Sequence, residues 1–156
     1  MSEEISNAKG SIKPTLWVIS EPYYPEETST GYYLTKIAEG LANDAHVKVL
    51  CAQPTYSKRG IRAAKHEIHK GVEIFRVAST TLNKNVIPLR MINMMTLGIG
   101  TLFNAMRRLK KGDLVLVVTT PPSTPFFIAL ASLARGAAYT LLIHDSYPDL
   151  LVAVGK

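Results

Sequence analysis

The chain has 156 residues, of which 47% are hydrophobic and 19% are charged, and this balance describes a globular protein and excludes a disordered one. Its net charge of +6 fits an anionic partner, such as a phosphate ligand, a nucleic acid or a lipid surface, or simply a basic soluble protein. A single cysteine, Cys51, excludes an intrachain disulfide and fits a reducing compartment, so we expect a cytoplasmic protein.

Residues 1–13 lack the apolar core of a signal peptide, and we expect a disordered tail before one folded domain of residues 14–156. Five β-rich runs follow: LWVIS (16–20), HVKVLC (46–51), VEIFRV (72–77), LVLVVT (114–119) and YTLLIH (139–144). Most are continuous apolar runs, as in parallel strands that are covered on both faces.

Two helices are predicted between these runs. Residues 30–44 have apolar side chains at helical spacing, with Ser29 or Thr30 as N-cap, and residues 121–138 begin with prolines and carry Gly136 near their end. The alternation of strands and helices predicts an α/β fold with a doubly wound parallel sheet and right-handed crossovers.

The segment 87–111 is different, because its apolar positions do not keep to one face. It ends in four basic residues: Arg107, Arg108, Lys110 and Lys111. One interpretation is a buried crossover helix whose last turn is solvated and complements the helix dipole. The other is a helix on an anionic membrane surface, with the basic residues on the headgroups. Arg90 and Asn93 argue against a helix that spans the membrane.

Ligands of open α/β sheets bind beyond the carboxyl ends of the strands, and polar, rigid segments follow the predicted strands here. Ser29-Thr30-Gly31 precedes a helix, so its N–H groups can receive a phosphate, although the tripeptide is also an ordinary cap. His144 and Asp145 end the last strand. They can bind sugar hydroxyls, stabilise charge or accept a proton, or they simply cap the strand and the turn that follows.

Other sites receive little support from the sequence. The string GIG (98–100) lies inside a helical run and not after a strand, so it is not a dinucleotide fingerprint. A hydrolase or a metal site is not indicated, since no Ser/His/Asp order, CxxC pair or HExxH helix occurs. The basic residues lack interleaved aromatic residues on a recognisable platform, which disfavours a nucleic-acid binder.

Four segments occur in a characteristic order: YYPEETSTGYYLTKIAEGLA (23–42), PTYSKRG (54–60), VVTTPPSTPFFIALASLARGAAYTL (117–141) and DSYPDLLVAVG (145–155). Together, over roughly residues 15–156, they resemble the N-terminal half of family 4 glycosyltransferases with the GT-B fold, of the type that builds bacterial exopolysaccharide or lipopolysaccharide. Many relatives have paired glycines where this chain has Ser29-Thr30-Gly31, so the diphosphate contact is the weakest part of the match.

The resemblance implies a Rossmann-like, acceptor-binding domain of a retaining enzyme that moves a sugar from a nucleotide-sugar to a polysaccharide or lipid-linked acceptor, without a metal or other cofactor. Thr30 and Gly31 would approach the donor phosphate, and His144 and Asp145 would lie at the transferred sugar. Four residues would line the acceptor side: Glu21, Glu26, Glu27 and Tyr56.

Relatives continue into a second domain that binds the nucleotide-sugar, and these 156 residues contain no counterpart of it. We therefore expect that domain as a partner, and no activity from the chain alone. Two alternatives stay open: a non-catalytic subunit that recruits a split glycosyltransferase to the membrane, and a Rossmann-type oxidoreductase or epimerase domain. The latter is disfavoured because no GxGxxG follows the first strand.

Overall fold

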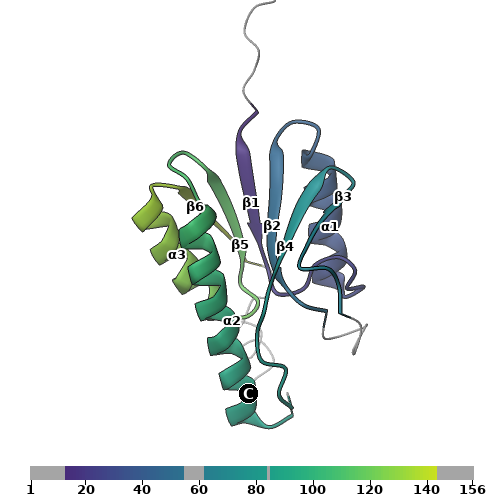
Figure 1. Ribbon diagram of the computed structural model, residues 1–156, viewed down its shortest axis with the longest axis vertical. Helices are drawn as coiled ribbons and strands as arrows, with labels where there is room; N and C mark the ends of the chain where they lie inside the picture. The colour runs from purple at the N-terminus through teal and green to yellow at the C-terminus, as the bar shows by residue number, and fades with distance from the viewer. Residues whose placement is uncertain (1–12, 55–61, 84, 144–156) are drawn as a thin grey trace, which may run out of the picture.

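The fold is an α/β sandwich built on one sheet, shown in Figure 1 as a computed structural model that describes residues 13–54, 62–83 and 85–143. In chain order the elements are β1 (Thr15–Ile19), α1 (Ser29–Leu41), β2 (His46–Ala52), β3 (His66–His69), β4 (Val72–Val77), α2 (Ile87–Arg108), β5 (Leu114–Val118), α3 (Thr124–Arg135) and β6 (Ala138–Leu142). The sheet order is β3-β4-β2-β1-β5-β6, and all neighbours are parallel except β3 and β4. The predicted Rossmann-like, doubly wound sheet is confirmed.

The antiparallel edge strand β3 was not predicted, because its sequence HEIH is short and half charged and resembles a loop. It pairs with β4 from His66 opposite Phe75 to His69 opposite Val72. The connecting turn consists of Lys70 and Gly71, which both have positive φ angles, of 47° and 80°. Two successive residues with positive φ are typical of a tight hairpin turn, so the backbone fixes this register.

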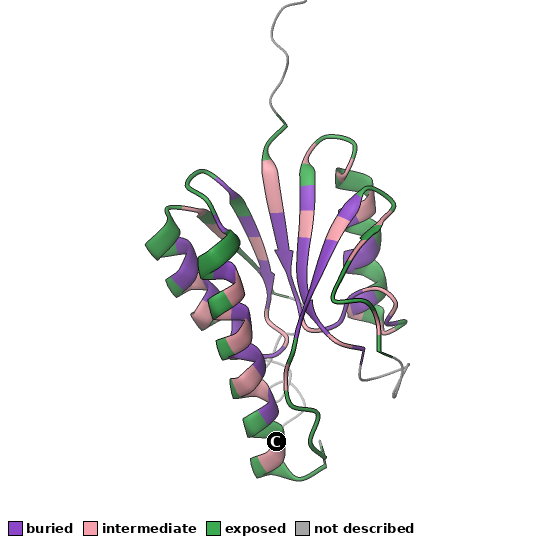
Figure 2. Cartoon of the chain, in the orientation of Figure 1, coloured by how far each residue is buried: buried purple, intermediate pink, exposed green. Residues whose placement is uncertain are grey.

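Helices cover both faces of the sheet, and residues that alternate along each strand divide into two cores (Figure 2). Val18, Val49 and Ile74 pack with Leu34 and Ala38 of α1. The opposite core, against α2 and α3, contains Trp17, Ile19, Leu50, Phe75, Val77, Leu97, Val117 and Ile128. This alternation follows from the two-residue period of a strand, and it places α1 on one face and the other two helices on the other.

The cap of α1 differs from the prediction. Thr28, not Ser29 or Thr30, is the N-cap residue, and its side-chain oxygen accepts a hydrogen bond of 3.2 Å from the N–H of Gly31. Thr30 lies within the first turn of the helix. The helix therefore begins at least one residue earlier than the sequence suggested, and the preceding loop is correspondingly shorter.

Helix α2 differs from the predicted buried crossover helix, because its buried face is small and partly polar while much of its apolar surface is exposed; its place on a membrane surface stays a prediction. The buried residues are Asn93, Leu97, Gly98, Thr101 and Ala105. A Cβ atom on Gly98 would lie 2.5 Å from the Phe127 ring of α3, so only glycine permits this close helix crossing. The prediction that residues 87–111 form a buried crossover helix with only its last turn in solvent is therefore wrong. Within the described residues, no helix combines the length and the apolar character needed to cross a membrane.

Candidate functional site

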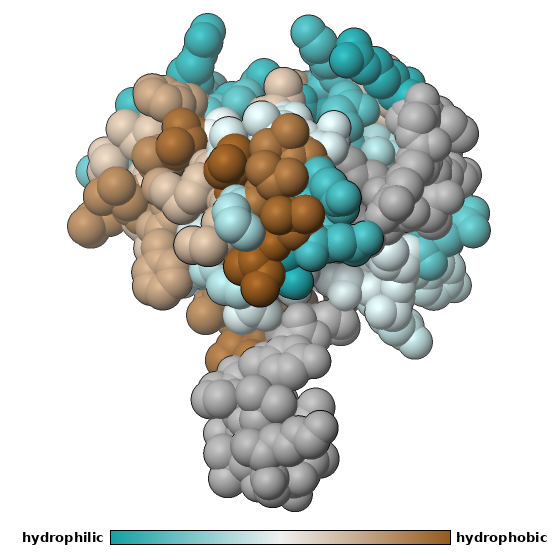
Figure 3. Space-filling view, turned by 90° about the horizontal axis from the view of Figure 1, so that it is seen from below, coloured by the Kyte–Doolittle hydropathy of each residue, from teal (hydrophilic) through white to brown (hydrophobic). Residues whose placement is uncertain are grey.

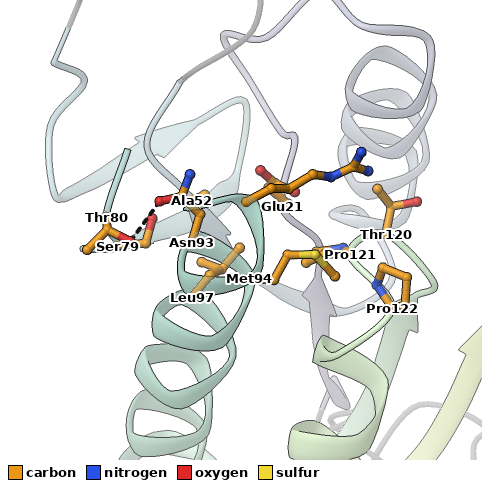
Figure 4. Close-up of a pocket in the computed structure, with 11 residues that line it drawn as sticks. Glu21, Ala52, Ser79, Thr80, Asn93, Met94, Leu97, Thr120, Pro121 and Pro122 are labelled. Carbon is orange, nitrogen blue, oxygen red and sulfur yellow. Dashed lines mark hydrogen bonds between the residues drawn. The ribbon is translucent and has the colours of Figure 1, made fainter. Parts of the chain in front are cut away.

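A pocket lies at the carboxyl edge of the sheet, where β1 and β5 are neighbours. The chain leaves β1 through α1 on one face of the sheet, and it reaches β5 through α2 on the other face. Ligands of doubly wound sheets bind at such a switch point, because the two crossovers separate there and leave a crevice. Eleven residues line the pocket: Glu21, Ala52, Ser79, Thr80, Arg90, Asn93, Met94, Leu97, Thr120, Pro121 and Pro122 (Figure 4).

The segments after β1, β2 and β5 are fastened to one another at this pocket. The N–H of Glu21 donates to the carbonyl of Thr120 at 3.5 Å, and the Glu21 carbonyl accepts from the N–H of Ala52 at 3.1 Å. The Glu21 backbone is therefore held between the ends of two other strands. Its side chain is half-buried and lines the pocket, so a carboxylate lies at the switch point.

The wall on the β4 side is held by Asn93, which is 9% exposed on α2. Its Oδ1 accepts from the Thr80 hydroxyl at 2.8 Å and from the Leu82 N–H at 3.0 Å, and its Nδ2 donates to the Leu82 carbonyl at 2.9 Å. The hydroxyls of Thr96 and Thr80 are also 2.8 Å apart. These bonds fix the loop after β4 to the helix, so this wall is preorganised before any ligand binds.

Arg90 adds a cation to the same pocket. It lies one turn before Asn93 and Met94 on α2. Its side chain is exposed, and its guanidinium forms no hydrogen bond or ion pair with the residues that the structure describes. The pocket thus combines one carboxylate, one guanidinium and several hydroxyl groups. Its volume of about 80 Å³ corresponds to two or three water molecules at about 30 Å³ each, which suits a small polar group or one edge of a sugar ring.

Gly31 lies in close contact with the loop that precedes α1. A Cβ atom there would lie 2.9 Å from the carbonyl oxygen of Glu26 and 3.0 Å from the Thr28 hydroxyl, so any larger residue would push the loop away. The N–H of Gly31 is already bonded to Thr28. Contact of Thr30 and Gly31 with a donor phosphate stays a prediction.

Glu26 and Glu27 line a second pocket, beside α1, which shares no lining residue with the pocket at Glu21. Tyr24 stacks on His69 in this second pocket with ring centroids 3.8 Å apart. Glu39 also lines it and pairs with Lys36, His69 and Lys70. The predicted acceptor wall is thus divided between the two pockets. Its fourth residue, Tyr56, and the predicted catalytic pair His144 and Asp145 lie outside the described residues.

A buried arginine fastens the first loop to the sheet. Arg76 of β4 donates to the carbonyls of Tyr24 and Ala64, each at 2.7 Å, and pairs with Glu67 of β3. Cys51, its neighbour across the ladder, is buried, and burial raises the pKa of this thiol to about 12. Cys51 is therefore a neutral core residue under α1 and not a nucleophile.

The predicted membrane-surface cations do not all behave alike. The guanidinium of Arg108 lies 3.9 Å from the centre of the Phe75 ring, so this residue covers the core. The side chains of Arg107, Lys110 and Lys111 are exposed. In the described ranges, no group of three or more His, Cys, Asp or Glu side chains is arranged to hold a metal ion.

Several pocket residues were missed from the sequence. Ser79, Thr80 and Thr120 belong to segments that were recognised only as polar strand ends. Arg90 and Asn93 were noted only as polar residues within an apolar helix. The sequence signal that was missed is their spacing: residues 90, 93 and 97 are three and four positions apart, so they share one face of the helix. Neither a scan of family models nor a search of curated proteins finds a match to this chain.

Proposed function

We propose that the chain is the acceptor-binding domain of a retaining GT-B glycosyltransferase, which moves a sugar from a nucleotide-sugar to a polysaccharide or lipid-linked acceptor. The observation that carries this proposal is the pocket at the switch point between β1 and β5, where a carboxylate and several hydroxyl groups lie among apolar side chains. Carboxylate, hydroxyl and amide groups on rigid segments suit a ligand with many hydroxyl groups. The order of the four sequence segments supports the same family.

In this proposal the Glu21 carboxylate orients an acceptor hydroxyl, and Thr120 bonds a neighbouring one. A second, nucleotide-sugar-binding domain closes over the small pocket and completes the site. The amino end of α1, near Thr30 and Gly31, takes the donor phosphate, because helix N-termini favour negative charge. Charge on the leaving diphosphate is then stabilised without a metal ion.

The test is sugar transfer with the native enzyme, or with this chain and its donor-binding partner, on a panel of nucleotide-sugars. Glu21→Gln keeps the shape but removes the charge, and we expect at least a tenfold loss of turnover. Asp44→Asn, in the exposed turn after α1, is the matched control and keeps full activity. Transfer by this chain alone, or unchanged turnover in Glu21→Gln, would contradict the proposal, and stoichiometric nicotinamide binding would favour the oxidoreductase alternative.

We also propose that the protein is cytoplasmic and binds peripherally to the inner membrane face. Support comes from α2 and α3, which contain no Asp or Glu and expose large apolar side chains, including Met91, Phe103, Phe126 and Leu133. Cations next to an apolar helical face favour an anionic lipid surface.

Flotation with vesicles tests the membrane proposal. We expect the protein to float with phosphatidylcholine vesicles that contain phosphatidylglycerol, and less with phosphatidylcholine alone. A variant with Gln at 107, 108, 110 and 111 should lose this charge dependence, whereas the control Lys36→Gln/Lys70→Gln, beside α1, should retain it. Vesicle binding combined with turnover that ignores Glu21 would support the membrane-recruiting subunit instead.

A further inference from the structure

The second pocket lies between α1 and the β3–β4 hairpin, on the face of the sheet opposite to α2 and α3. Its walls consist of residues 24–27 in the loop after β1, one side of α1, and His69 and Lys70 of the hairpin. Its volume is about 170 Å³, against about 80 Å³ for the pocket at Glu21. The two pockets share no lining residue, so each can hold a ligand of its own.

The charges in the second pocket are already paired. The Glu39 carboxylate lies 3.1 Å from Nζ of Lys36 and 3.4 Å from Nζ of Lys70, and Nε2 of His69 is also 3.4 Å from it. Two further carboxylates, at residues 26–27, each interact with other groups of the chain. An ion would have to replace one of these partners, whereas a hydroxyl group can donate to a carboxylate and accept from an ammonium group. The pocket therefore favours a neutral ligand that carries several hydroxyl groups.

Tyrosine rings add flat apolar surfaces to the same walls. Tyr24 stacks on His69 with ring centroids 3.8 Å apart, and Tyr32 of α1 lines the pocket with a side chain that is 53% exposed. Nζ of Lys36 lies 5.8 Å from the centre of the Tyr32 ring, so a hydrogen-bond donor is next to this ring. Aromatic rings with a few convergent polar groups are the usual lining of sites for small ligands. A sugar matches this lining, because it has an apolar C–H face and a rim of hydroxyl groups.

Hydrogen bonds hold the walls of this pocket in place. The buried guanidinium of Arg76 donates to the Tyr24 carbonyl at 2.7 Å, which fixes the loop to the sheet. The Thr35 hydroxyl donates to the Gly31 carbonyl at 2.7 Å within the first turns of α1. The loop and the helix are therefore ordered before a ligand binds, and the entropy that binding costs is small.

The surface on this side of the molecule is hydrophilic. Seen from the carboxyl edge of the sheet, strongly apolar atoms gather at the end of α2 and on the side of α3, whereas the side on which α1 lies in Figure 1 carries mostly pale and hydrophilic atoms (Figure 3). Large apolar patches mark surfaces for proteins or membranes, and their scarcity here fits a hydrated ligand.

We propose that this pocket is a second saccharide-binding site, which takes one ring of a neutral oligosaccharide. The C–H face of the ring lies on Tyr32, and its hydroxyl groups bridge the carboxylates of residues 26–27 and the ammonium groups of Lys36 and Lys70. The inference goes beyond the proposed function, since it adds a site that binds a saccharide without reacting with it. Binding here requires neither a nucleotide-sugar nor the pocket at Glu21.

The tyrosines provide internal probes for the test, because the chain contains seven of them. Fluorotyrosine places a ¹⁹F label on both pocket rings, Tyr24 and Tyr32, and on Tyr139 at the other face of the sheet, and single Tyr→Phe substitutions assign the signals. Cellotriose, maltotriose and mannotriose, each added alone, are the neutral probes. Inorganic phosphate is the ionic control.

We expect at least one trisaccharide to shift the Tyr24 and Tyr32 signals saturably and to leave Tyr139 unchanged. Phosphate at the same concentration should cause no saturable shift. Tyr32→Ala, followed through the Tyr24 signal, should weaken saccharide binding at least tenfold. The matched variant is Tyr33→Ala, which changes the next residue of α1, 60% exposed but outside the pocket lining, and it should bind as the wild type does. Circular dichroism is the control for folding.

Three outcomes would overturn the inference: no saturable shift with any of the trisaccharides, displacement of the saccharide by phosphate, or equal binding in Tyr32→Ala and the wild type. The outcome is independent of sugar transfer. An active glycosyltransferase with no saccharide response at Tyr32 would refute this site alone. A response at Tyr32, in an enzyme whose turnover ignores Glu21, would refute the proposed function and retain the site.

Discussion

The two helical layers of this sheet differ in how they meet their surroundings. Beside α1, Glu39 is only 13% exposed and pairs with Lys36 of the same helix and with His69 and Lys70 of the β3–β4 hairpin. Helices α2 and α3 have no carboxylate with which to form such pairs, although all three helices expose large apolar side chains. One layer is closed by ion pairs with its neighbours, and the other presents a surface without charged partners, which is where we propose that the acceptor and the membrane bind.

The same contrast holds inside the layers. Helix α1 buries Leu34 and Ala38 on the sheet in the usual manner of an amphipathic helix. Helix α2 has a partly inverted pattern, because it buries Asn93 and Gly98 beside Leu97 while many of its larger apolar residues face outward. The exposed apolar residues of α2 take no part in its packing on the sheet, so they are better explained by a partner than by the fold.

The largest expected effect is on the reactivity of Cys51, which lies in the core under α1. Its burial and its pKa of about 12 leave almost no thiolate, so Ellman's reagent should label the native protein at least about a thousandfold more slowly than the denatured protein. The absorbance of the released thiolate measures the rate. Labelling at the rate of a free thiol would mean that the α1 layer opens freely, and the contrast between the layers would fail.

The next effect concerns the buried arginine that holds the loop before α1. Arg76→Met removes hydrogen bonds to Tyr24 and Ala64 and leaves Glu67 without its partner, so we expect a loss of about 3–5 kcal/mol in the free energy of unfolding. Urea denaturation measures it. The control Arg107→Met, on an exposed side chain, should change the free energy of unfolding by less than about 0.5 kcal/mol.

A pair of glycine substitutions compares the two layers directly. Gly98→Ala forces a methyl group to within 2.5 Å of the Phe127 ring, and we expect it to cost about 1–3 kcal/mol of stability. Gly40→Ala in α1 meets no atom within 4 Å, so it should stabilise the protein by about 0.5–1 kcal/mol through helix propensity. Thermal unfolding of both variants measures these changes in stability. Equal effects would show that the α2–α3 crossing is not tightly packed.

The sheet could be predicted from the sequence because its strands are continuous apolar runs, a pattern that comes from burial on both faces. The hairpin strand β3 could not, since His66 and Glu67 are held there by pairing with β4 and not by their own propensity. The inverted pattern of α2 produced two competing interpretations, because periodicity alone does not say which face of a helix meets the sheet.

The candidate site was predicted only in its location. Polar strand ends indicated the carboxyl edge, and Glu21 does line the pocket there. The separation of Glu21 from Glu26 and Glu27 could not be foreseen, since it depends on the path of one loop across the α1 face. Arg90 and Asn93 reach the pocket from a helix that precedes β5, and only the tertiary fold brings them to the end of β1.

The smallest effect is the pH dependence of the ion pairs at α1. Burial of Glu39 favours the neutral acid, but the hydrogen bond from Lys36 and the charge of Lys70 outweigh it and lower the pKa of Glu39 below its ordinary value of 4.5. A carboxyl whose pKa is lower in the folded state stabilises the fold above that ordinary value, and this contribution is lost as the pH falls through the lower, folded-state pKa. Urea unfolding between pH 6 and pH 3 should therefore show a shallower decline in Glu39→Gln than in the wild type. Because α2 and α3 have no carboxylate to protonate, the free energy of unfolding of Arg107→Gln should decline with falling pH as that of the wild type does. If the decline were equally shallow in both variants, acid would act on the whole molecule and not on the α1 layer.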